Sequence, residues 1–428
     1  MQARLPIGTT ATAEVEHQIE DAPRLAFTVA GLFAGIGGVE IGFREAGHHS
    51  VFMCEFDESA KAVLTARFPD IEIWSDVVDL ERLPEADIVS AGFPCQDLSL
   101  AGRARGISAA RSGLVWHIFR LLDAAGERPR WLLLENVPFL LQLQNGDGMR
   151  LLVDELEQRG FMWAYRVVDT RAFGLPQRRR RVLIAASTSE DPRGPLLGTD
   201  SNGPALQPAD PNTPCGFYWT EGHRGIGWSQ GWVPPIKVGS GLGIPSPPAI
   251  WFPATGRIAV PDIRDLERLQ GFDADWTKPA EEAGRRNDRW RLVGNAVSVP
   301  VSRWLGERLS SPRAYNSSHD WPMAKVGAWP HAGWGAAGER YESSASMWPT
   351  SVQLPPLDAF LRYEGQDISP RAAAGLLSRL ERFGAKVPIK FVDDLKRISG
   401  ETSEAAAHSS ERTPADAEWL GSSLDAPS

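Results

Sequence analysis

Apolar runs rich in β-branched and aromatic residues alternate with helical patterns through the first half of the chain. The apolar runs are bounded by turn residues and occupy residues 27–33, 50–56, 86–93 and 131–137. Patterns suited to helices occupy residues 57–68, 112–125 and 149–160. This alternation predicts a doubly wound, mostly parallel α/β sheet with helices on both faces. Two later runs, 163–168 and 181–186, would extend that sheet, with an antiparallel strand at its edge as one option.

The pattern changes after residue 186 and divides the rest of the chain. Residues 187–261 are rich in Gly, Pro and Trp and have few helical patterns, which predicts a smaller, irregular and partly β domain. Helical patterns return after residue 261, including one from Ala296 to Leu309. The predicted units are an N-terminal tail (1–23), a first domain (24–186 with 262–312), a small domain (187–261), an extension packed on the small domain (313–400) and a disordered acidic tail (401–428).

The composition is that of an ordinary globular protein, with 42% apolar and 23% charged residues among 428. The three cysteines, Cys54, Cys95 and Cys215, form no C-x-x-C pair, which argues against a disulfide scaffold and against a zinc site. The first twenty residues do not resemble a signal peptide, and no stretch approaches the roughly 18 apolar residues of a membrane helix. We therefore expect a protein of the cell interior without membrane spans.

The charge is unevenly distributed. The net charge is −9, but residues 1–22 contribute −3 and residues 401–428 contribute −5. Arg171 and Arg178–Arg181 give five positive charges within eleven residues that contain no acid. Because local basic clusters rather than net charge determine phosphate binding, the composition allows a nucleic-acid partner.

Residues suited to binding or catalysis stand where the predicted strands end. The first strand ends in the Gly-rich turn Phe33–Gly38, where a ligand can approach the backbone closely, although the spacing is not that of a dinucleotide fingerprint. Glu55 and Asp76 follow the next strands and could bind hydroxyl or amino groups, with helix capping as the simpler alternative. Cys95 and Glu135 follow the last two strands and form a candidate pair of nucleophile and proton donor.

These segments occur in the same order as in the DNA cytosine C5-methyltransferases, a family that the chain resembles over residues 27–309. The matching segments are Phe33–Gly38, Glu55, Asp76, Gly92–Gln96, Glu135–Val137, Gln177–Arg181, Arg268–Phe272 and Gly294–Val297. The resemblance implies a Rossmann-like methyltransferase fold with residues 187–261 as the target-recognition domain. It also implies S-adenosylmethionine as the methyl donor, S-adenosylhomocysteine as the product, and no metal.

The resemblance assigns roles to individual residues. The implied catalytic residues are Cys95, Glu135, Arg179 and Arg181. The implied cofactor-binding residues are Phe33, Gly35, Ile36, Gly37, Glu55, Phe56, Asp76, Val77, Pro94, Leu114, Asn295 and Ala296. The implied DNA contacts are Gln96, Ser99, Arg103, Arg105 and Asn136.

The chemistry explains why these residue types recur. C5 of cytosine is a weak nucleophile, and addition of the Cys95 thiolate to C6 would make the ring electron-rich enough to accept a methyl group. Glu135 would donate a proton at N3 and accept a hydrogen bond from the 4-amino group, while Arg179 and Arg181 would steady the O2 edge, the carboxylate or the nearby loop. The cytosine must leave the duplex to reach the thiolate.

The expected partner is double-stranded DNA, with a cognate restriction endonuclease acting separately where one exists. We expect a cytoplasmic monomer of a prokaryote or phage. Two alternatives remain open, a catalytically silent cytosine-flipping DNA-binding protein and a tRNA cytosine-5 methyltransferase. The intact Cys95 and Glu135 argue against the first, and the 187–261 insert and the lack of a Cys-Phe-Thr signature argue against the second. A Rossmann oxidoreductase fits less well because the Gly spacing differs.

Overall fold

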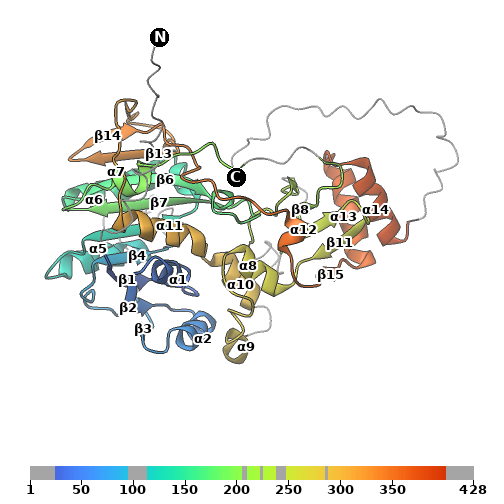
Figure 1. Ribbon diagram of the computed structural model, residues 1–428, viewed down its shortest axis with the longest axis horizontal. Helices are drawn as coiled ribbons and strands as arrows, with labels where there is room; N and C mark the ends of the chain where they lie inside the picture. Colours follow the sequence, from blue (N-terminus) through green and yellow to red (C-terminus); the bar gives the residue numbers. More distant parts are fainter. Residues whose placement is uncertain are drawn as a thin grey trace, which may run out of the picture.

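A ten-stranded sheet forms the larger part of the computed structural model, which describes residues 25–94, 113–204, 210–221, 225–237, 247–284 and 288–401 (Figure 1). The strand order is β12-β14-β13-β6-β7-β5-β4-β1-β2-β3. The strands nearest the N-terminus run parallel to one another and are β1 (Thr28–Leu32), β2 (His49–Cys54), β3 (Glu72–Trp74), β4 (Ile88–Ala91) and β5 (Trp131–Asn136). Their carboxyl ends therefore meet at one edge of the sheet, as the sequence predicts.

The strand predicted at residues 181–186 is antiparallel but does not lie at an edge. β7 (Arg180–Ser187) is inserted between β5 and β6 (Met162–Asp169) and runs antiparallel to both. The sheet continues past β6 through β13 (Ala332–Ala336), β14 (Glu339–Glu342) and the short β12 (Trp321–Pro322). Because β7 runs in reverse, its first residues lie at the edge where β4 and β5 end.

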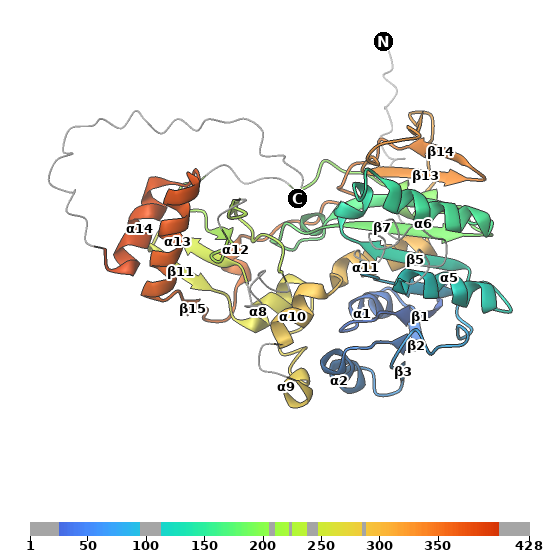
Figure 2. The ribbon, with the colours of Figure 1, turned by 180° about the vertical axis from the view of Figure 1, so that it is seen from behind.

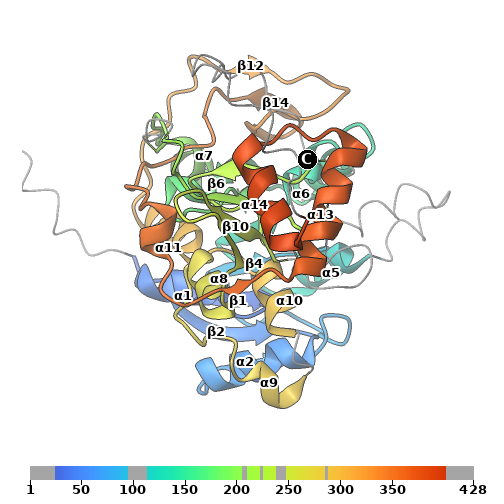
Figure 3. The same ribbon diagram turned by 90° about the vertical axis from the view of Figure 1, so that its right-hand side faces the viewer.

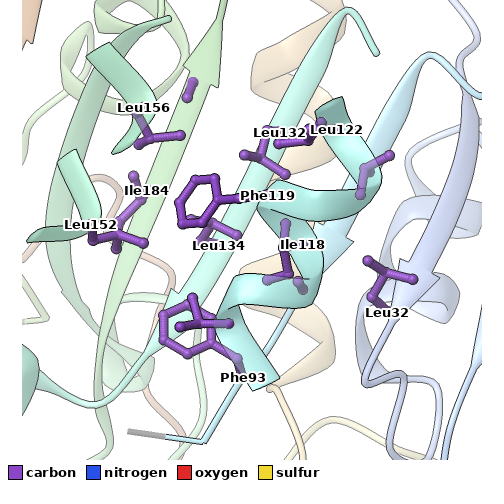
Figure 4. Close-up of a cluster of buried hydrophobic side chains, with 14 of the residues drawn as sticks. Leu32, Phe93, Ile118, Phe119, Leu122, Leu132, Leu134, Leu152, Leu156 and Ile184 are labelled. Atoms are coloured by element: carbon purple, nitrogen blue, oxygen red, sulfur yellow. The ribbon is translucent and has the colours of Figure 1, made fainter. Parts of the chain in front are cut away.

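Helices cover both faces of the large sheet (Figure 2). On one face lie α1 (Gly38–Glu45), α7 (Arg193–Leu197) and α11 (Val299–Ser310), which share a buried core with the strands. On the other face lie α5 (Leu114–Ala124) and α6 (Asp147–Gln158). Figure 4 shows this second core, in which Phe119 of α5 and Leu152 of α6 pack beside the strand residue Leu134. The near-continuous apolar sequences of β4 and β5 follow from burial on both faces.

A segment late in the chain returns to the first strands. It contains α8 (Ile263–Leu269), α9 (Ala280–Ala283) and α10 (Asp288–Asn295) and leads into α11, while α2 (Glu58–Arg67) packs against α9. The sequence predicts one helix from Ala296 to Leu309, but α11 begins only at Val299. Pro300 fits the first turn of a helix and not its interior, which accounts for the later start.

The small domain is built on a second, antiparallel sheet with the order β15-β11-β10-β8-β9. Its strands are β8 (Cys215–Phe217), β9 (Ser229–Gln230), β10 (Ala249–Phe252), β11 (Arg257–Val260) and β15 (Gln366–Asp367). Two helices, α13 (Pro370–Phe383) and α14 (Ile389–Ser399), pack on it and stand in front of it in Figure 3. The core between them includes Phe217, Trp251 and Phe391.

The C-terminal extension is divided between the two sheets. Residues 321–342 supply β12, β13 and β14 to the large sheet, whereas α12 (Leu357–Phe360), β15, α13 and α14 belong to the small domain. The expectation that 313–400 packs on the small domain therefore describes only its second half. The described part of the chain contains no helix with the length and apolar character needed to cross a membrane.

Candidate active site

The Gly-rich turn after β1 is held open by backbone geometry that few side chains tolerate. Phe33, Gly35 and Gly37 all have positive φ angles, at 56°, 58° and 84°. A Cβ at Gly37 would overlap the ring of Phe68, whereas no atom lies within 4 Å of the corresponding position at Gly35. Ile36 is buried beneath the turn. The turn thus exposes the Gly35 backbone to open space at the edge of the sheet.

Glu55 follows β2 and points into this turn. Its Oε2 accepts a hydrogen bond of 2.7 Å from the Gly35 amide, and its Oε1 accepts one of 2.8 Å from the Asp57 amide. Burial raises the pKa of Glu55, and these amide donors oppose that rise. The neighbouring Phe56 ring is 74% exposed, which is unusual for a phenylalanine. A carboxylate and a bare aromatic face therefore flank the Gly35 turn.

The loop that carries Asp76 is organised by an arginine that the sequence reading overlooked. Asp76 Oδ1 accepts from the Val78 amide at 2.9 Å, and Arg120 of α5 donates from Nη2 to the carbonyls of Val77 and Leu80 at 3.0 and 2.8 Å. The Val77 side chain is buried in the core, so any contact that Val77 makes with a ligand would come from its backbone. An exposed arginine on a helix gives no sequence signal for this role.

The return segment approaches the turn from the other side. Trp276 donates from Nε1 to the Ile36 carbonyl at 2.8 Å, and Arg291 contacts Asp57 Oδ2 at 2.8 Å. A Cβ at Gly38 would overlap the carbonyl oxygen of Val297. Asn295 is exposed and Ala296 is buried, immediately before that contact. Residues far along the chain thus contact the Gly-rich turn and Asp57, and two of them, Trp276 and Arg291, were not predicted.

The second half of the site lies where β4, β5 and β7 meet. Arg181 Nε lies 2.7 Å from Glu135 Oε1, and both side chains are mostly buried, at 16% and 17% exposure. Burial lowers the pKa of Arg181, and the Glu135 carboxylate opposes that shift. Glu135 also lines a cavity of about 30 Å³, enough for about one water molecule, together with Val39, Gly92 and Val297. The cavity joins this carboxylate to the helix that follows the Gly-rich turn.

Asn136 and Arg179 are both buried, and each donates to backbone carbonyls of another segment. Asn136 is only 3% exposed, and its Nδ2 donates to the Phe93 carbonyl at 3.0 Å, so this side chain does not reach DNA. Arg179 is fully buried and donates from Nη2 to the carbonyls of Gly294 and Ala296 at 3.1 and 2.6 Å. Both residues hold other segments in place.

Several predicted site residues lie outside the described residues. These are Cys95, Gln96, Ser99, Arg103 and Arg105. The described segment that leads to them, Gly92–Pro94, runs beside Glu135 and Asn136: the pairing of Ala91 with Leu134 sets Gly92 opposite Glu135. Leu114 begins α5 on the far side of the gap and packs against the core. Among the described residues, no group of three or more His, Cys, Asp or Glu side chains could hold a metal ion.

The sheet order and the site define a class of protein: a Rossmann-like α/β fold with a Gly-rich turn and carboxylates at adjoining strand ends. Residues 27–204 match the model of the C-5 cytosine-specific DNA methylases. The chain is 44% identical over 379 residues to the type II methyltransferase M2.BsuMI of Bacillus subtilis, an alignment that covers 86% of this chain and 97% of that protein. The chain belongs to the C-5 cytosine-specific DNA methylase family.

Other relatives match smaller parts of the chain. The type II methyltransferase M.NgoBI of Neisseria gonorrhoeae is 36% identical over 302 residues, covering 63% of this chain and 89% of that protein. Among solved structures, the Entamoeba histolytica methyltransferase EhMeth aligns with a TM-score of 0.48 and 14% identity, covering 67% of this chain and 98% of that one.

Proposed function

We propose that the protein transfers a methyl group from S-adenosylmethionine to C5 of a cytosine in a specific sequence of double-stranded DNA. The observation that carries the proposal is the Glu135–Arg181 pair beside Gly92–Pro94, the residues that immediately precede Cys95. A carboxylate fixed by an arginine next to a strand-end cysteine provides both the proton donor and the nucleophile that this reaction requires.

The residues around the Gly-rich turn suit S-adenosylmethionine, which supplies an electrophilic methyl group when bound. Glu55 presents a carboxylate to the ribose hydroxyls, and the exposed Phe56 ring offers a stacking face for adenine. Asp76 would accept from the adenine amino group, and the open space at Gly35 leaves room for the methionine part. Asn295 would close the pocket from the return segment.

The proposed reaction assigns one step to each catalytic side chain. The Cys95 thiolate adds to C6 of the flipped cytosine, and the electron pair moves toward N3, where Glu135 supplies a proton. C5 of the resulting enamine would take the methyl group, and S-adenosylhomocysteine would leave with the electron pair of the broken sulfur–methyl bond. A base would then remove the C5 proton, so that the C5–C6 double bond re-forms while the C6–sulfur bond breaks and the Cys95 thiolate leaves. The N3 proton would return to Glu135. Arg181 fixes the Glu135 carboxylate throughout, and Arg179 positions the Gly294–Ala296 segment without touching the base.

The names of the relatives support a proposal for the biological setting of this activity. Two of them are type II methyltransferases, a name that belongs to restriction-modification systems, so we propose that this methylation protects DNA from a separate endonuclease. The small domain would read the recognition sequence from the grooves of the duplex. A single flipped base requires only one protein molecule, so we propose a monomer acting in the cytoplasm of a prokaryotic host.

The test measures transfer of labelled methyl from S-adenosylmethionine to unmethylated DNA and to tRNA in parallel, followed by bisulfite sequencing of the DNA. We expect label only on DNA, at cytosines in one sequence context. Cys95→Ser should retain cofactor binding and lose nearly all transfer, and duplex DNA with 5-fluorocytosine at the target should trap a covalent complex. Cys215→Ala, at a cysteine buried in the small domain, is the matched control and should still form that complex.

The two alternatives give different results in the same experiment. Label on tRNA alone would identify an RNA methyltransferase. Binding of duplex DNA without transfer to any substrate would identify a silent DNA-binding relative. Transfer by Cys95→Ser at the wild-type rate would remove the thiolate from the mechanism.

A further inference from the structure

Three arginines near the start of β7 share one buried carboxylate. Asp169, at the end of β6, is fully buried and accepts from Arg171 Nε and Nη2 at 2.9 Å each. Arg180 Nε lies 3.6 Å from the same carboxylate. Arg178 is the third arginine of this cluster, and its pKa is lowered first by burial and then by Arg171 and Arg180. One negative charge therefore faces three positive charges.

Arg178 differs from its neighbours because its guanidinium makes no hydrogen bond and no close ion pair with the residues that the structure describes. Its backbone amide donates to the Val233 carbonyl at 2.9 Å, beside the bridge that pairs Gln177 with Val233. This pairing fixes the Arg178 backbone at the junction of the large and small domains. The side chain is half-buried, which removes part of its hydration without supplying a counter-charge. Such a group gains most from an anion that arrives from outside.

Within the described ranges 210–221 and 225–237, the small-domain side of the junction does not supply that anion. Tyr218, which follows β8, lies close enough to influence the pKa of Arg178, but burial raises its own pKa far above neutrality, so it stays uncharged. Lys237 Nζ lies 4.0 Å from the centre of the Tyr218 ring and 2.6 Å from Glu221 Oε1. The Glu221 carboxylate is therefore already paired with a lysine, and the charge excess at Arg178 remains.

The distance to the catalytic pair restricts where the anion lies. Arg178 precedes Arg181 by three residues, and three residues of extended chain span roughly 10 Å. Successive base pairs of a duplex are about 3.4 Å apart, so an anion at Arg178 would lie within roughly three nucleotides of a base held at Glu135. A guanidinium binds a phosphate through two parallel hydrogen bonds, a geometry that suits a DNA backbone better than a base edge at a half-buried site.

We propose that the Arg178 guanidinium binds a backbone phosphate of the substrate DNA close to the flipped cytosine. This inference rests on the proposed function, because it requires duplex DNA beside Glu135 and Arg181. Arg178 would fix the register of the duplex without reading its sequence. Its neighbours have other tasks: Arg179 holds the return segment and Arg181 holds Glu135.

The experiment measures equilibrium binding of a short fluorescent duplex of mixed sequence to the full chain, with S-adenosylhomocysteine present, over a series of salt concentrations. Arg178→Ala should weaken binding about tenfold and should reduce the slope of log affinity against log salt by about 0.9. Arg178→Lys should keep the slope because it keeps the charge. Arg303→Ala, which removes an exposed arginine of α11 paired with Glu307, is the matched control and should change neither quantity.

The remaining outcomes overturn the inference. An unchanged slope and affinity in Arg178→Ala would show that no phosphate is bound there. A loss confined to one DNA sequence would instead indicate a base contact. A lower melting temperature or weaker S-adenosylmethionine binding in Arg178→Ala, with the DNA salt slope unchanged, would indicate a purely structural role. Failure of the wild-type protein to bind or methylate any DNA would refute the proposed function itself. This outcome is distinguishable from the others because it is measured on the wild type and not on the Arg178 variants.

Discussion

Glu40 is a buried acid that the proposed reaction does not use, and its ionisation should control the pH dependence of stability. It is the third residue of α1 and is 1% exposed. One carboxylate oxygen fills the space where a side chain at Gly31 would stand, and Oε2 has no hydrogen-bond partner among the described residues. Burial, together with the nearby Glu55 carboxylate, raises the pKa of Glu40 from 4.5 to about 7, although the Glu40 backbone amide opposes the rise.

The free energy that Glu40 ionisation contributes to stability follows from this rise in pKa. Each pKa unit is worth about 1.4 kcal/mol, so a rise from 4.5 to about 7 corresponds to about 3 kcal/mol. Because the folded-state pKa lies above the unfolded value, the folded protein binds the proton more tightly. The stabilisation is complete below pH 4.5 and is lost as the pH rises to about 7. Above that pH, the buried ionised carboxylate of Glu40 destabilises the folded state.

Glu40→Gln tests this reasoning because glutamine has nearly the same shape and stays neutral. The free energy of unfolding of the cofactor-free wild type and variant is measured by urea denaturation at several pH values. The difference between them should be smallest near pH 4.5 and should shift by about 3 kcal/mol in favour of the variant by pH 8. Contributions from titrating groups that do not interact with Glu40 cancel in this difference, whereas Glu55 does interact with it. A difference that stays constant over the whole range would show that Glu40 does not titrate between those values.

Two further substitutions separate cofactor binding from structural support. Glu55→Gln should weaken S-adenosylmethionine binding about tenfold, as measured by calorimetry. A neutral amide accepts hydrogen bonds from the ribose hydroxyls and the Gly35 amide less well than a carboxylate does. Unchanged affinity would show that Glu55 is not part of the cofactor site. Arg179→Met should lower the free energy of unfolding by about 2–4 kcal/mol, because the buried carbonyls of Gly294 and Ala296 lose their hydrogen-bond donor. A variant that unfolds in urea at the same midpoint as the wild type would contradict this prediction.

The sequence predicted those parts of the molecule that depend on local pattern and on the ends of strands. The parallel strands and the positions of Glu55 and Glu135 at their carboxyl ends follow from apolar runs that stop at a polar residue. The direction of a side chain does not follow in the same way. Asn136 adjoins Glu135 in sequence, yet strand alternation turns it to the opposite face, where Phe93 needs a hydrogen-bond donor.

Contacts between residues far apart in the sequence were the second feature that the local sequence pattern could not predict. Arg178, Arg179, Arg180 and Arg181 are identical residues in a row, and only the fold distinguishes them, through Asp169, Glu135 and the carbonyls of the return segment. β15 is two residues long, and its pairing with β11 joins parts of the chain about a hundred residues apart. No periodicity can be read from two residues, so that strand could be found only in three dimensions.

The construction of the small domain explains why the recognition region cannot be bounded at residue 261. Its core combines Cys215, Phe217 and Trp251 from the central region with Leu376 and Phe391 from the extension. Neither set alone would bury its apolar face, since a sheet of short strands needs a second layer to pack against. The alignment with M2.BsuMI covers a larger share of this chain than residues 1–309 make up, so it necessarily includes part of the extension. The similarity to that relative therefore continues past the last family motif into the segment that completes the small domain.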